Sequence, residues 1–140
     1  MGVRKVVYAP MTADIITPGH IRFIKKCHHY GDVVIGLLTD HAVKGYKKII
    51  MTYLERCEVL DAVKWVKSIV PQNGLYCYTN LMKCQANYLA SGDGFDPKEI
   101  EAAKNAGCKL LNIKLAGEKN GKKWSSTNIK KRILCQKDFS

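Results

Sequence analysis

Short apolar runs alternate with helix signals along this chain, and this order limits the possible folds more than any other feature of the sequence. The run Val33–Leu38 (VVIGLL) is almost entirely apolar, which is typical of a central parallel strand covered on both faces. Similar runs predict four further strands, over residues 3–9, 66–70, 88–90 and 109–113. Strands that alternate with helices form a parallel sheet with right-handed crossovers. We therefore predict an α/β fold: one Rossmann-like domain over residues 1–140, with a five-stranded parallel sheet flanked by helices.

The helices between these strands have recognisable ends. Thr52 and Glu55 have the spacing of a capping box, which predicts a helix that begins after Thr52. Asp96 and Pro97 predict another helix start, and Gly107 is a typical residue just beyond a helix end. Two more helices are predicted, over residues 18–30 and from residue 125 or 126 to residue 134.

In a fold of this type, the ligand lies beyond the carboxyl ends of the parallel strands. The loops that leave those ends cover residues 9–20, 39–48, 91–96 and 116–126. These loops also contain glycines, hydroxyl residues and clustered lysines, which are not needed to form the neighbouring helices and strands. We therefore predict that the functional site is built from these four loops.

The chain carries 23 Lys and Arg residues against 12 Asp and Glu, a formal net charge of +11, which predicts an anionic partner. The sequence lacks a run of about 18 apolar residues, so we expect no membrane span. The six cysteines do not have zinc-site spacing, and residues 1–10 do not resemble a signal peptide. We expect a cytoplasmic protein that does not act on membranes.

The segment from Thr12 to His20 has the composition of a phosphate-binding turn. It leaves a predicted buried strand and enters a predicted helix, whose unpaired N–H groups and dipole favour an anion. Gly19 allows the backbone to approach a ligand closely, while Thr17 and His20 offer side-chain donors. The segment therefore predicts contact with a phosphate group.

Thr17-Pro18-Gly19-His20 resembles the (H/T)xGH signature of the nucleotidyltransferase superfamily. Thr12 and Asp14 also match the signature block of glycerol-3-phosphate cytidylyltransferases. The longer block from residue 13 to residue 56 resembles more closely the cytidylyltransferase domains of phosphonate biosynthesis. Residues 124–129 (WSSTNI) resemble the second signature of these enzymes. Two departures stand out: Thr17 replaces the first histidine of the signature, and the loop SGDGF (residues 91–95) lacks the second aspartate of the related HGDDW-type loop.

The resemblance implies a cytidylyltransferase that moves CMP from CTP to a small phosphonate or phosphate acceptor and releases pyrophosphate. It implies Mg²⁺ held largely by phosphates and waters, with no metal-ligating residues of its own, and a homodimer. The implied catalytic residues are His20, Lys47 and Thr17, and Lys44 and Lys47 are the implied acceptor-binding residues. The implied nucleotide-binding residues are Thr12, Asp14, Gly19, Arg56, Gly92, Asp93, Ser125, Ser126 and Thr127.

Several alternatives stay open at this point. An adenylyltransferase acting on a phosphorylated cofactor precursor also fits the signature, and Thr17 favours it. A basic nucleic-acid-binding or regulatory domain fits the charge, but the chain has no RNP-like aromatic pair, GxxG clamp or zinc knuckle, so we expect no nucleic-acid partner. Asp14 either positions backbone, holds a metal or caps its loop. Arg56 either binds a phosphate with its fork or forms a structural ion pair.

Overall fold

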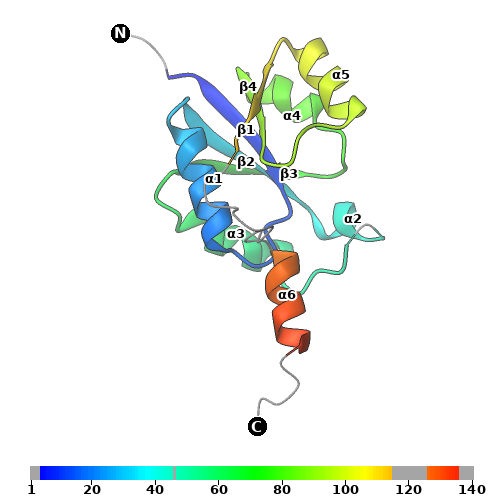
Figure 1. Cartoon of the computed structure of the whole chain (residues 1–140). Helices are drawn as coiled ribbons and strands as arrows, with labels where there is room; N and C mark the ends of the chain where they lie inside the picture. The colour runs from blue at the N-terminus through cyan, green and yellow to red at the C-terminus, as the bar shows by residue number, and fades with distance from the viewer. Residues whose placement is uncertain (1–3, 46, 115–125, 136–140) are drawn as a thin grey trace.

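The computed structural model describes residues 4–45, 47–114 and 126–135, with the side chains of 126–128 excepted. Its five strands are β1 (Val6–Met11), β2 (Asp32–Leu38), β3 (Val66–Gln72), β4 (Tyr88–Ser91) and β5 (Lys109–Asn112). Its helices are α1 (Pro18–His28), α2 (Asp40–Val43), α3 (Tyr53–Asp61), α4 (Tyr78–Lys83), α5 (Pro97–Ala106) and α6 (Ser126–Cys135). Figure 1 shows how these elements are arranged.

All neighbouring strands are parallel, and their order in the sheet is β3-β2-β1-β4-β5. The register places Val7 of β1 opposite Val33 of β2 on one side and Tyr88 of β4 on the other. The prediction of one α/β domain with a five-stranded parallel sheet is confirmed.

Alternate residues of the central strands supply two cores, one on each face of the sheet. On one face, Val7 and Ile35 pack with Ile24 of α1 and Leu60 of α3. On the other face, Tyr8 packs with residues of α4 and α5, among them Leu81, Ala102 and Ala103. Because successive side chains of a strand point to opposite faces, both faces of β1 and β2 must be apolar. This requirement explains the continuous apolar run in β2 and places helices on both faces of the sheet (Figure 1).

Helices α3 and α5 begin where their capping residues predict. Thr52 and Glu55 exchange hydrogen bonds, with Thr52 N–H donating to Glu55 Oε1 at 3.0 Å and Glu55 N–H donating to Thr52 Oγ1 at 3.3 Å. Asp96 and Glu99 form the same reciprocal pair at the start of α5. Helix α5 ends at Gly107, whose φ of +73° is left-handed and suits glycine. These helix ends are confirmed.

Several strand boundaries and two short helices differ from the predictions. Strand β1 covers Val6–Met11 instead of residues 3–9, and β4 and β5 end at Ser91 and Asn112. Strand β3 continues through Pro71 to Gln72, where the sequence predicted a stop, because β3 is an edge strand and needs ladder hydrogen bonds on one side only. Helices α2 and α4 were not predicted, since helices of 4 and 6 residues are too short for a clear helical period.

Gly36 lies in β2 directly beneath the buried Tyr8 ring. A Cβ at Gly36 would lie 2.0 Å from Tyr8 Oη and 2.9 Å from Gln72 Oε1. The Tyr8 hydroxyl cannot move freely, because it donates to Gln72 Oε1 at 2.5 Å and accepts from Asn80 Nδ2 at 2.9 Å. We expect Gly36→Ala to lower the free energy of unfolding by about 1–3 kcal/mol or more, measured by urea denaturation.

Gly74→Ala is the matched control, because among the described residues no atom lies within 4 Å of the Cβ it would add. We expect its unfolding midpoint to match that of the wild type. Equal midpoints for both variants would mean that Tyr8 does not pack as the structure has it.

Among the described residues, no helix has both the length and the apolar composition needed to span a membrane.

Candidate active site

The order in which strands are added to the sheet reverses direction beside β1. The chain passes from β1 to β2 on one side, and later returns to pair β4 on the other side of β1. Ligands of open parallel sheets bind at the carboxyl ends of the strands at such a point. The segments that leave these ends carry Thr12 to His20 after β1, Lys44 and Lys47 after β2, and Gly92 and Asp93 after β4. The topology thus brings these predicted residues to one edge of the sheet.

Thr17 and His20 are joined at the start of α1. The Thr17 backbone N–H donates to His20 Nδ1 at 3.0 Å, and the Thr17 hydroxyl oxygen lies 3.0 Å from the same nitrogen. Because Nδ1 accepts the backbone hydrogen bond, we assign the imidazole proton to Nε2. Burial, and then the nearby charge of Lys47, lowers the pKa of His20. His20 is therefore a neutral ring that offers an Nε2–H donor.

The first turn of α1 adds backbone donors beside this ring. It consists of Pro18, Gly19, His20 and Ile21, none of which is acidic. Gly19 is buried, and the proline at the first helical position has no N–H to leave unpaired. The positive end of the helix dipole and its N–H groups favour an anion here.

Asp14, in the loop that leads to this turn, is buried, with a relative exposure of 2%. Its two carboxylate oxygens accept from the backbone N–H groups of Ile50 and Met51, each at 2.8 Å, and Lys130 Nζ forms an ion pair with it. Burial alone would raise the pKa of Asp14, but the hydrogen bonds from Lys130, Met51 and Ile50 hold it below the ordinary value. Of the roles left open for Asp14, these contacts correspond to the positioning of backbone.

Arg56 of α3 is completely buried beneath the same loops. Its guanidinium donates to the carbonyl oxygens of Thr12 and Leu38, each at 2.8 Å, and to that of Met51 at 3.1 Å. It also forms an ion pair with Asp40 at 2.9 Å. The resemblance implied that the Arg56 guanidinium binds a phosphate, but in the structure it donates to protein oxygens. Arg56 instead joins the ends of β1 and β2 to the segment before α3.

The lysines of this edge are exposed. We call residues 47–51 the lysine loop; it is joined to α2 by the Lys47 N–H, which donates to Val43 O at 3.0 Å. Lys44 and Lys47 are both exposed, and Lys47 is close enough to His20 to affect its pKa. A flexible ammonium group beside a neutral imidazole can contact the same phosphate from a second direction.

The loop after β4 is ordered by its own serine. Ser91 Oγ donates to Gly94 O at 2.6 Å and accepts from the Asp93 N–H at 3.2 Å. Gly92 and Asp93 are exposed, and an added Cβ at Gly92 would lie 3.6 Å from the Phe23 ring of α1. The loop therefore sits against the helix that carries His20, one turn along from it.

The last predicted group is described only in part. Ser125 lies outside the described residues, and for Ser126 and Thr127 the structure gives the backbone at the start of α6. Lys130, which contacts Asp14, was not singled out by the sequence analysis. The two residues are 116 positions apart, and the sequence shows Lys130 only as one of a cluster of basic residues.

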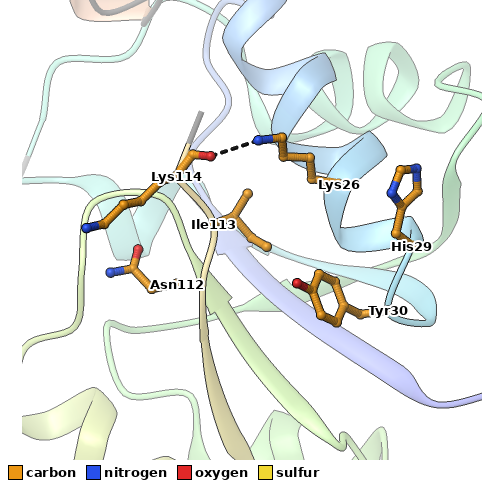
Figure 2. Close-up of a pocket in the computed structure, with 6 residues that line it drawn as sticks. All are labelled: Lys26, His29, Tyr30, Asn112, Ile113 and Lys114. Atoms are coloured by element: carbon orange, nitrogen blue, oxygen red, sulfur yellow. Dashed lines mark hydrogen bonds between the residues drawn. The ribbon is translucent and has the colours of Figure 1, made fainter. Parts of the chain in front are cut away.

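A cavity of about 380 Å³ lies elsewhere, at the far end of α1. Figure 2 shows its lining, which comes from the end of α1 and from β5 and the residues after it: Lys26, His29, Tyr30, Asn112, Ile113 and Lys114. Lys26 Nζ closes one side by donating to Lys114 O at 2.8 Å. Its α1 lining begins at Lys26, six residues and about 9 Å along the helix axis from His20, and His20 is not among the lining residues.

Known proteins resemble this chain over most of its length. A family model described as cytidylyltransferase-like matches residues 8–132. The FAD synthase of Archaeoglobus profundus is 29% identical over 132 residues, covering 91% of this chain and 85% of the relative. The bifunctional protein HldE of Campylobacter curvus is 29% identical over 103 residues, but this chain spans only 22% of its length.

Solved structures are similar in fold. The lipopolysaccharide core biosynthesis protein from Thermoplasma volcanium superposes with a TM-score of 0.69 at 19% sequence identity, covering 81% of this chain and 97% of that one. A protein of unknown function from Archaeoglobus fulgidus superposes with a TM-score of 0.59 at 17% identity, covering 78% of this chain and 88% of that one.

Proposed function

We propose that this chain, which belongs to the cytidylyltransferase-like family, transfers CMP from CTP to a small phosphonate or phosphate acceptor. Family membership and the similarity to proteins named FAD synthase support nucleotidyl transfer as the reaction class. The observation that carries the proposal is His20: a neutral imidazole protonated at Nε2, at the start of α1 and beside Lys47. Neutral donors, ammonium groups and a helix N-terminus suit phosphate chemistry that needs no protein nucleophile.

In the proposed reaction, an acceptor oxygen forms a bond to the α-phosphorus while the bond from that phosphorus to its bridging oxygen breaks. The electron pair of the broken bond leaves with pyrophosphate. The acceptor oxygen arrives as an anion, so no general base is required. His20 Nε2–H and Lys47 donate to the phosphate oxygens on which charge develops, and Gly92 and Asp93 contact the base and ribose. Positioning and charge stabilisation then account for the rate.

Mg²⁺ would neutralise the phosphate charges when bound with the nucleotide. In the part of the chain that the structure describes, no group of three or more His, Cys, Asp or Glu side chains could hold a metal ion. Asp14, in the loop after β1, already accepts from two backbone N–H groups and Lys130. We propose that phosphate oxygens and waters supply most of the coordination of Mg²⁺, an ion that readily retains its waters.

A second candidate is transfer of AMP from ATP. The similarity to proteins named FAD synthase favours it, because their named product contains an adenine nucleotide. Thr17 at the first position of the signature also favours it. The block of residues 13–56, similar to the cytidylyltransferases of phosphonate biosynthesis, favours CTP. The acceptor, the homodimer, the cytoplasmic location and the absence of nucleic-acid binding stay predictions.

We expect CTP with Mg²⁺ to raise the melting temperature more than ATP, GTP or UTP does. A ligand that binds only the native state at 100 times its Kd stabilises the fold by about 2.7 kcal/mol. Pyrophosphate release, measured for each nucleotide with a panel of small phosphates and phosphonates, should show the same preference. A larger shift and faster release with ATP would replace CMP transfer by AMP transfer. Absence of release with all four nucleotides across the panel would contradict the proposed function.

A further inference from the structure

We propose that Lys130 is a positioning residue, which together with Asp14 forms a clasp that holds the lysine loop and α6 against the loop after β1. This inference rests on the proposed function for its catalytic consequence, but the clasp itself is a set of contacts that can be tested without substrate. Lys130 lies in α6, far in the sequence from the segments that it joins.

The contacts of Lys130 join two segments at once. Its ammonium group pairs with Asp14 Oδ2 and also donates to Lys48 O at 3.0 Å. Asp14 in turn accepts from the N–H groups of Ile50 and Met51. The carboxylate and the ammonium therefore hold the lysine loop through three of its backbone groups.

The burial of this pair explains why both charges are needed. The Asp14 side chain has a relative exposure of 3%, and that of Lys130 has 24%. A buried carboxylate is costly unless it is paired and hydrogen-bonded, and removing one partner of a buried pair leaves the other uncompensated. Without Lys130, Asp14 keeps only two neutral donors, and its hold on the Ile50 and Met51 N–H groups should weaken.

The clasp lies where the predicted phosphate-binding groups meet. Asp14 precedes Thr17 and His20 in the loop after β1, and the lysine loop begins at Lys47. Helix α6 begins at Ser126, one helical turn before Lys130. The ion pair therefore links α6 to the loop that carries His20 and, through Lys48 O, to the lysine loop. A misplacement of about 1 Å between such groups can reduce the rate about a hundredfold.

Lys130→Met tests the clasp, because methionine keeps much of the side-chain length without the charge. Lys131→Met is the matched control, since Lys131 is the next residue of α6 and is exposed. We expect hydrogen exchange at the Ile50 and Met51 amides to become about tenfold faster in Lys130→Met and to stay unchanged in Lys131→Met. We expect kcat to fall about 10- to 100-fold in Lys130→Met only, and Lys130→Arg to recover most of it.

The pH dependence separates this role from a general loss of stability. Lys130 contributes to holding the pKa of Asp14 low, so its loss should move the acidic fall in amide protection and in kcat to higher pH. The exchange measurement needs no substrate. Faster exchange in Lys130→Met would support the clasp, whether or not the wild type is active. If the wild type also releases no pyrophosphate, only the proposed function is contradicted. Wild-type exchange at Ile50 and Met51 in Lys130→Met would overturn the clasp.

Discussion

Replacing His20 with alanine should lower turnover about a hundredfold or more, while the melting temperature changes little. The imidazole is neutral, its Nδ1 is occupied by the Thr17 N–H, and its Nε2–H is left to donate to the phosphate on which charge develops. Loss of one preorganised donor of this kind costs about 10²–10³ in kcat. If His20 served only as part of the helix cap, its removal would cost about 1 kcal/mol of stability and little rate.

His29→Ala is the matched control for this variant. His29 caps the other end of α1 and is exposed. The substitution therefore removes the same kind of ring from the same helix, at a distance from the site. Turnover with saturating substrates and the unfolding free energy should be measured on the same preparations. A His20→Ala protein that is less stable but turns over normally at low temperature would contradict the catalytic role. Nδ1 is contacted by both the backbone N–H and the hydroxyl of Thr17, and the backbone contact remains in side-chain variants, so Thr17 side-chain variants should retain more activity than His20→Ala.

The lowered pKa of His20 provides a second readout on the same variant. Burial and Lys47 lower this pKa in the folded state, so the unfolded chain binds the proton more readily. The stabilisation is therefore present above the unfolded pKa of about 6.5 and is lost as the pH falls below it. We expect the unfolding free energy to fall more steeply below that pH in the wild type than in His20→Ala. Parallel pH curves would show that His20 is not held neutral by its surroundings.

Arg56→Met should lower the free energy of unfolding by about 3–5 kcal/mol, the largest stability effect that we expect from a single substitution in this chain. The change removes the donors of three carbonyl oxygens, those of Thr12, Leu38 and Met51. A buried polar group that loses its partner costs about 1–3 kcal/mol. Lysine cannot replace the planar fork of arginine at these separate acceptors, so Arg56→Lys should also be destabilised.

Arg4→Met is the control for this second variant. Arg4 also forms an ion pair, with Asp32 at 3.0 Å, and also donates to a backbone carbonyl, that of His28. Its side chain is 50% exposed, so its loss should cost no more than about 1 kcal/mol. Urea denaturation measures both. An Arg56→Met protein with wild-type stability and strongly reduced turnover would instead support the phosphate fork that the sequence resemblance implied.

The sequence alone determined those features that depend on neighbouring residues. The capping box at Thr52, the helix start at Asp96 and Pro97 and the helix end at Gly107 were predictable because each involves contacts within about one helical turn. The apolar run of β2 indicated a strand buried on both faces, since its pattern follows directly from the geometry of a strand. The order of these local signals was sufficient for the parallel sheet and for the edge at which its loops converge.

The tertiary structure alone decided what the charged residues of that edge do. Asp14 and Arg56 were predicted to bind nucleotide, but only the fold shows that Asp14 accepts from N–H groups of the lysine loop and that Arg56 donates to the Met51 carbonyl of that loop. Lys130 was indistinguishable from its basic neighbours until the chain placed it against Asp14, 116 residues away. A charge has no directional signature in a sequence, because its partner is chosen by packing and burial over the whole chain.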